Sequence, residues 1–344
     1  MTDELAGAIL LAVLTLYATL AGADFGGGLW DLLAGGARAG RPARTLIDET
    51  ITPVWEANHV WLIFALVICW TCFPSAFAAV MSSAALPLWL AALGIVLRGA
   101  GFAFRKEVRG LRSERVLGAT FALSSLLTPF FMGTVVGAVA ARRVKLDAHH
   151  SALAAWTGST SLLIGGLFVA VCAYLAAVYL IGEAVRRDDR RHERYFRRRA
   201  AIAGVGASAV SLAALPVLHH SDAALYHGLT GRALPLVVLA AACGVAVLAL
   251  LALGHSRGLR ALSALGVAAV VWGWGVGQYP TLLPGTGLTI FNGSAPHDTL
   301  VAIIAVCGLA ALLVGPAFLL LFRLHGRQLL ASEDSSHAAG GGDG

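Results

Sequence analysis

The chain has 344 residues, of which 58% are hydrophobic and 13% are charged, and its mean hydropathy is +0.78. Soluble domains carry about 25% charged residues, so this composition excludes an ordinary soluble protein and favours one embedded in a lipid bilayer. The formal net charge is +6, but the basic residues lie in short segments between apolar blocks, which indicates membrane topology rather than nucleic-acid binding.

Nine apolar blocks approach the length of about 20 residues that a membrane-spanning helix needs. Their approximate limits are Leu5–Leu33, Val54–Met81, Ala84–Phe104, Val116–Ala141, Ser159–Gly182, Ala200–Leu218, Leu234–Leu253, Ala261–Val276 and Leu300–Phe322. Backbone groups in lipid must be satisfied within their own segment, and period-2 alternation is absent, so all nine are predicted to be helices. The first block lacks the features of a cleaved signal peptide and is expected to be retained.

The expected architecture is an all-α integral membrane protein with two four-helix bundles and a peripheral ninth helix. Residues 1–327 form the polytopic domain, and residues 328–344 are predicted to be a disordered polar tail. The odd-numbered loops and the tail carry 20 of the 25 basic residues, against four in the even-numbered loops. The positive-inside rule therefore places the N-terminus outside and the C-terminus in the cytoplasm. The fifth loop, with eight arginines, is predicted to extend a helix into the cytoplasm and to meet membrane lipid.

Asp24 lies inside the first apolar block, in the stretch "LAGADFGGGLWDLL". Gly22 and Gly26 form a G-x-x-x-G pattern, which lets a second helix approach closely. Asp24 is about 200° around the helix from Gly22, so it points away from that contact. Gly27 and Gly28 flank the carboxylate and are expected to leave space for water. An interior acid is favoured over an acid at the membrane surface.

The second block opens with "PVWEANHVWL", which places ionisable residues before a long apolar run. His59 shares a helix face with Glu56, whereas Asn58 is about 200° away and is predicted to bond a different helix. Trp61 suits the interfacial aromatic belt. Glu56 has a second explanation, because an acid at a helix N-terminus is favoured by the macrodipole, and position alone does not decide between them.

Arg98 lies within the third block and is predicted to pair with Asp24 or Glu56, while Arg105 at the block's end can extend to the membrane surface. Two acids, an imidazole and an arginine on the cytoplasmic side predict a proton-uptake route. Its predicted members are Asp24, Glu56 and His59, with Asn58, Trp61, Arg98 and Arg105 as supporting residues.

Ligands for redox groups are scarce in this sequence. Of eleven histidines, His59 alone lies well inside a predicted span, so no haem, metal site or catalytic residue is expected in this chain. Cys69 and Cys72 form a C-x-x-C pattern, which is interpreted as packing residues in preference to a redox pair.

Five motifs carry a family resemblance: "GADFGGG", "TPVWEANHVWLI", "FPSAFA", "LRGAGFAFR" and "YPTLLP" followed by "LTIFN". In this order and spacing the chain resembles subunit II of the cytochrome bd-type quinol oxidases. The resemblance implies a bacterial cell-membrane complex that oxidises quinol and reduces O₂ to water. It also implies a heterodimer in which the partner, subunit I, holds haems b and d. A bound quinone and small extra subunits are further expectations from the family.

The resemblance places the family's first-helix acid on Asp24 and its second-helix acid, commonly Asp, on Glu56. Ala21 and Ala103 stand where relatives often carry further acids, which implies a less acidic proton route. Two other functions stay open: a proton-coupled transporter, which would show paired broken helices, and a quinone-linked thiol oxidoreductase using Cys69 and Cys72.

Overall fold

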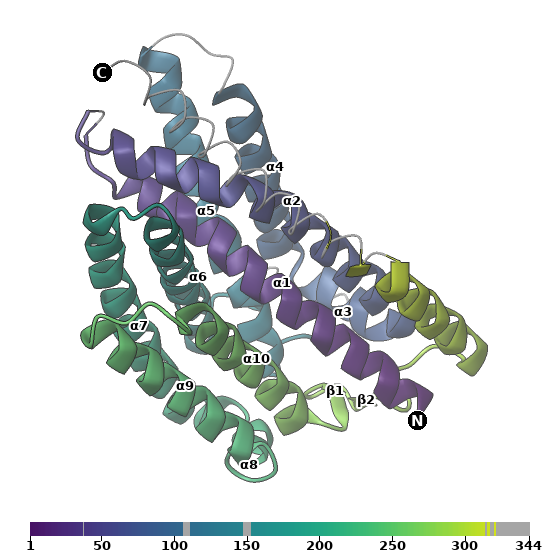
Figure 1. Cartoon of the computed structure of the whole chain (residues 1–344). Helices are drawn as coiled ribbons and strands as arrows, with labels where there is room; N and C mark the ends of the chain where they lie inside the picture. The colour runs from purple at the N-terminus through teal and green to yellow at the C-terminus, as the bar shows by residue number, and fades with distance from the viewer. Residues whose placement is uncertain (37, 106–110, 147–152, 314, 317–319, 321–344) are drawn as a thin grey trace, which may run out of the picture.

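Helices packed side by side form almost the whole molecule (Figure 1). The computed structural model describes residues 1–36, 38–105, 111–146, 153–313, 315, 316 and 320. The helices are α1 (Thr2–Leu32), α2 (Arg41–Cys72), α3 (Pro74–Ser83), α4 (Ala85–Arg105), α5 (Leu111–Ala140), α6 (Ser159–Arg186), α7 (Arg190–Ser221), α8 (Ala223–Thr230), α9 (Leu234–Ala252) and α10 (Leu259–Gln278). Strands β1 (Thr281–Leu283) and β2 (Leu288–Thr289) form a short antiparallel hairpin, and an apolar helix follows over His297–Leu313.

Six of these helices are long and apolar enough to cross a bilayer, namely α1, α6, α7, α9, α10 and the Gly118–Ala140 part of α5. The block Val54–Met81 is not the one continuous helix that was predicted, because the chain bends by 116° between Asn58–Cys72 and Pro74–Ser83. Phe73 leaves the helical conformation at this bend, and Pro74 has no N–H with which to continue the ladder. The bent pair would make a seventh span, and the third and ninth blocks contain shorter apolar helices, Ala85–Gly101 and His297–Leu313. The predicted tail, residues 328–344, lies outside the described residues.

Two helices begin well before the apolar blocks that predicted them. α2 starts at Arg41 and α7 starts at Arg190, where the blocks began at Val54 and Ala200. The early start of α7 is the helix extension predicted for the fifth loop, whereas that of α2 was not predicted. The added first turns of α2 bury one face, and Ile47 and Ile51 on this face pack beside Gly27 of α1. Polar residues on the opposite face lower the mean hydropathy of such a segment, so an apolar window does not detect it.

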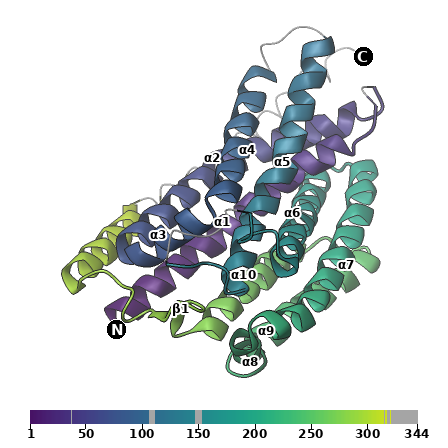
Figure 2. The ribbon, with the colours of Figure 1, turned by 180° about the vertical axis from the view of Figure 1, so that it is seen from behind.

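α1 runs through the middle of the molecule and packs against α2, α5, α6 and α10 (Figures 1 and 2). α4 packs on α5 to one side of it, while α7, α9 and α10 pack in sequence on the other side. Buried apolar residues form two large clusters. One joins α1, α2, α6, α7, α9 and α10, and the other joins α1, α2, α3 and α5 with the hairpin.

The loops gather at two opposite ends of the helices. At one end, Arg44 pairs with Asp31 at 2.9 Å, Arg187 pairs with Glu49, and Arg197 donates to the carbonyl of His255 at 3.2 Å. These contacts bring the first, fifth and seventh loops together. At the other end, Ser294 donates to Asp3 at 2.7 Å and Tyr279 donates to Glu4 at 2.8 Å, which fastens the eighth loop to the start of α1.

Candidate functional site

Asp24 is fully buried in the middle of the helix packing, with an exposed fraction of 0%. Its neighbours Gly22 and Gly26 face α6, where Leu175 and the carbonyl of Cys172 occupy the space that a Cβ would need. The close helix contact predicted from the G-x-x-x-G pattern is therefore present. Asp24 points to the other side of α1, toward α2 and α4.

Arg98 and Asn58 bind the Asp24 carboxylate. Arg98 forms an ion pair with Oδ1 through Nη2 and donates to the Asp24 carbonyl at 2.8 Å. Asn58 donates from Nδ2 to Oδ2 at 3.3 Å. Arg98 also donates through Nη1 to the hydroxyl of Ser125, which in turn donates to the carbonyl of Phe121 at 2.5 Å. Helices α1, α2, α4 and α5 meet at this group.

Aromatic rings enclose the arginine. The Arg98 guanidinium carbon lies 4.4 Å from the ring centre of Phe121 and 5.2 Å from that of Phe25. Desolvating two charges costs several kcal/mol, which close pairing and further hydrogen bonds must offset. Asn58 gives the carboxylate a second hydrogen bond. The Ser125 hydroxyl and the two ring faces contact the guanidinium.

Three buried polar atoms around the pair have no hydrogen-bond partner among the described residues: Nε of Arg98, Oδ1 of Asn58 and Oγ1 of Thr128. The Thr128 hydroxyl lies against Gly94, one turn before Arg98 on α4. Ordered water commonly satisfies such atoms in protein interiors. The prediction that Gly27 and Gly28 leave space for water is wrong, because Ile51 fills the first position and Ser125 with Arg98 fills the second.

Glu56 lies deep within α2 and not at its start. Fifteen residues separate it from Arg41, which is about 22 Å of helix, so the macrodipole at the helix N-terminus does not explain this acid. The side chains of Glu56 and Arg105 lie outside the described part of the chain. Arg98 pairs with Asp24, which is one of the two partners predicted for it.

His59 and Trp61 contact other groups than Asp24 among the described interactions. Nδ1 of His59 lies 2.8 Å from the Trp55 carbonyl on the same helix, which assigns the proton to Nδ1, and the imidazole meets the Trp55 ring edge-on. Its Nε2 is the atom that faces away from this bond. Trp61 packs in the apolar cluster near the hairpin, with its ring centre 6.2 Å from that of Phe64.

Ser125 and Thr128 belong to the site, but they were not among the residues predicted for it. Both residues are buried and share one face of α5 with Phe121. Serine and threonine are common in membrane helices, where they bond the preceding turn. The i, i+4, i+7 spacing of these three residues is the signal that could have pointed to them.

Comparisons with known proteins identify relatives of this chain. The family model of cytochrome bd terminal oxidase subunit II matches residues 2–325. The chain belongs to this family. The cytochrome bd ubiquinol oxidase subunit 2 of Bacillus subtilis (strain 168) is 34% identical over 128 residues, a segment that spans 37% of each chain. A chain in the structure of bd oxidase from Geobacillus thermodenitrificans superposes with a TM-score of 0.78 at 25% identity. The superposition covers 94% of this chain and 99% of that chain.

The resemblance predicted from the five motifs is therefore confirmed, and this bd subunit II is a multi-pass bacterial membrane protein. Its described residues contain no group of three or more His, Cys, Asp or Glu side chains placed to hold a metal ion. Cys69 and Cys72 are free thiols, and Cys72 is fully buried against the apolar cluster, which supports a packing role.

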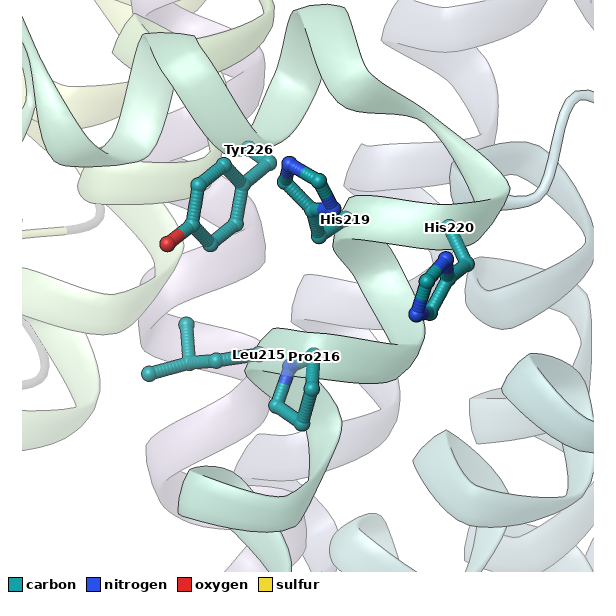
Figure 3. A pocket seen from close by; sticks show the side chains of 5 residues that line it. All are labelled: Leu215, Pro216, His219, His220 and Tyr226. Atoms are coloured by element: carbon teal, nitrogen blue, oxygen red, sulfur yellow. The ribbon is translucent and has the colours of Figure 1, made fainter.

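A separate pocket of about 320 Å³ opens where α7 meets α8 (Figure 3). Leu215, Pro216, His219, His220 and Tyr226 line it. The rings of His219 and Tyr226 pack edge-on, with centres 4.6 Å apart. Neither helix supplies a described partner of Asp24, so this pocket is a different feature from the buried ion pair.

Proposed function

We propose that this chain is the haem-free subunit of a membrane quinol oxidase, which oxidises quinol and reduces O₂ to water. In this proposal haems b and d belong to a partner subunit, and this chain supplies structure and part of a proton-uptake route. Family membership supports the assignment. The observation that carries the proton role is the buried Asp24–Arg98 pair with its adjoining unpartnered polar atoms.

The proposed route starts at the end that carries the arginine-rich loops and passes Glu56 and His59 toward Asp24. Ionisable groups inside a membrane protein are costly and mark ion or proton pathways. Asp24 offers a carboxylate, and Asn58 and Thr128 offer sites at which water can bind. His59 offers Nε2, because its other ring nitrogen is engaged by Trp55.

The haem-bearing partner is proposed to dock on the outward face of α2. Val60, Ile63, Val67 and Trp70 form an exposed stripe along this helix. Glu56 precedes Val60 by four residues, so its backbone position falls in the same helical register. An ionisable residue on a helix face that contacted only lipid would be strongly disfavoured. Its presence in this register supports a protein partner on this face of α2.

The grouping of helices supports the proposed pair of four-helix bundles. α1, α2, α4 and α5 make one group, and α6, α7, α9 and α10 make the other. Between the groups, α6 contacts α1, α2 and α5, and α10 contacts α1. A transporter is less well supported. One bent helix pair occurs among the described residues, and its break at Phe73 lies in an apolar cluster rather than at a charged site.

The proton role is tested in the purified oxidase with Asp24→Asn and Glu56→Gln combined. Quinol-driven O₂ consumption and proton uptake should fall by at least about tenfold, while the haem spectrum reports assembly. Asp222→Asn is the matched control, because Asp222 is another buried acid that caps α8 and Asn caps equally well. Unchanged proton uptake in the double variant would refute the route. Haem retained by this chain without a partner would refute the assignment of roles.

Small extra subunits and a quinone bound to this chain stay predictions from the family resemblance. Native mass spectrometry of the purified complex would detect both.

A further inference from the structure

Arg190, the first residue of α7, pairs with Asp188 at 3.6 Å, and the other arginines in the first turns of α7 fall into two sets. Arg197 and Arg199 serve the fold. Arg197 donates to Glu193 at 2.6 Å and to the carbonyl of Leu251 at 3.3 Å, so it fastens α7 to the end of α9. The Arg199 guanidinium carbon lies 3.4 Å from the ring centre of Tyr195.

The second set consists of Arg191, Arg194 and Arg198, and all three are exposed. Their spacing of three and four residues places them on one face of α7, over about 10 Å of helix. For these three, no acidic side chain within 4.0 Å is found among the described residues. The face therefore carries three positive charges that the described part of the chain does not neutralise.

The same face becomes apolar within one turn. Ile202, Val205 and Leu212 follow Arg198 by four, seven and fourteen residues, and they are 62%, 57% and 68% exposed. Gly206 adds open space beside them, since a Cβ there would meet nothing within 4 Å. α7 thus presents a cluster of guanidinium groups followed by an apolar stripe about 15 Å long.

We propose that this face of α7, defined by Arg191, Arg194, Arg198, Ile202, Val205 and Leu212, is a binding site for an anionic phospholipid. The guanidinium groups bind the lipid phosphate, for which their paired N–H donors are well shaped. The acyl chains lie along the apolar stripe. A free anion gains nothing from that stripe, and a zwitterionic lipid brings its own positive charge to a face that is already positive.

The test uses the detergent-purified, delipidated oxidase complex and its melting temperature. Dioleoyl phosphatidylglycerol should raise the melting temperature by about 4 °C more than dioleoyl phosphatidylcholine does. The site variant Arg191→Gln, Arg194→Gln, Arg198→Gln should lose this difference. The control variant Arg38→Gln, Arg41→Gln, Arg257→Gln removes the same charge from exposed arginines at the same end, away from this face of α7, and should keep it.

Native mass spectrometry supplies a second readout that does not depend on thermal stability. The wild type and the control variant should retain at least one more phosphatidylglycerol molecule than the site variant. Equal loss of lipid in both triple variants would reduce the effect to general surface charge and overturn the proposal. An equal rise in melting temperature with inorganic phosphate would point to a free-anion site and overturn it as well. Equal stabilisation of the wild type by both lipids would also overturn it.

Discussion

Among single residues, Asp24 and Arg98 depend on each other most strongly, because both are almost completely buried. Asp24→Asn leaves the guanidinium without its counter-charge in an apolar setting. Removing one partner of a buried ion pair typically costs about 3–5 kcal/mol, so the variant complex should melt at a clearly lower temperature or fail to assemble. Replacing both partners, as Asp24→Leu with Arg98→Met, should recover most of the stability but not the oxidase turnover. A stable single variant would contradict this interpretation of the pair.

The residues of the site differ in how far the sequence could predict them. Asp24 and Arg98 stand out because charged residues are rare in apolar blocks. Asn58 was expected to bond a neighbouring helix from its angle on α2, and it binds Asp24. The pairing of Arg98 with Asp24 depends on how α1 and α4 lie relative to each other, which no sequence pattern predicts. Thr128 shares a helix face with Phe121 and Ser125, but this spacing does not predict its position against Gly94, which follows from how α4 and α5 pack.

Among the helices, the contact between α1 and α6 depends on Gly26. A Cβ at this position would overlap the backbone carbonyl of Cys172, which cannot rotate away. Gly26→Ala should therefore force the helices apart and destabilise the protein by about 1–3 kcal/mol. Gly166→Ala is the matched control, since Gly166 lies inside α6 with open space around it and alanine favours a helix. Equal melting temperatures for the two variants would argue against close α1–α6 packing.

The start of α7 depends on Asp189, whose Oδ1 accepts from the backbone N–H groups of Arg191 and His192 at 3.1 and 3.0 Å. The backbone N–H and side chain of His192 hold the Asp189 pKa below its usual 3.8. The carboxylate therefore stabilises the fold above that pH, and the contribution disappears as the pH falls through the lower folded-state pKa. Asp189→Ala should cost about 1 kcal/mol at pH 7, and its melting temperature should converge with that of the wild type in acid.

Asp189→Asn distinguishes the contribution of the capping hydrogen bonds from that of the carboxylate charge. Asparagine caps helices about as well as aspartate, so this variant should stay near wild-type stability at pH 7 without the loss in acid. If alanine and asparagine destabilised the protein equally, the carboxylate charge rather than the capping bonds would hold the helix start.

Helix limits show where sequence reasoning succeeded and where it failed. The long apolar blocks located α6, α9 and α10 closely, because hydropathy measures the property that places them in lipid. It missed the first turns of α2, since those residues are amphipathic and pack on protein. It also joined α2 to α3, because Phe73 and Pro74 interrupt the helix without lowering the hydropathy of the block.

For the whole molecule, the proposed docking face on α2 makes a sharp prediction about assembly. Ile63→Trp should reduce copurification of the haem-bearing partner, because an added indole cannot fit a packed protein interface. Val245→Trp on α9 is the control, since Val245 is also exposed but lies on a helix of the other group. Lipid accommodates a tryptophan readily, so this variant should assemble normally. Equal copurification in both would place the partner on another face.

The orientation of the whole molecule can be tested through the two ends at which its loops gather. The basic loops meet at one end, as Arg187 with Glu49 and Arg197 with the His255 carbonyl demonstrate, and the positive-inside rule makes this end cytoplasmic. The main exception is the basic cluster after α5, and there Arg143 donates to the carbonyl of Ala154 at 2.7 Å within its own loop. Arg143 therefore has a structural role in its loop, and this role explains a basic residue on either side of the membrane.

Single cysteines in exposed loop positions therefore have opposite expected reactivities with a membrane-impermeant maleimide on intact cells. Leu146→Cys and Phe291→Cys should be labelled, because both residues are exposed at the end that carries the N-terminus. Arg190→Cys and Arg257→Cys should react only after the cells are permeabilised. The unsubstituted chain gives the background from the five native cysteines. The reverse pattern would invert the molecule in the membrane and would move the mouth of the proposed proton route to the outer surface.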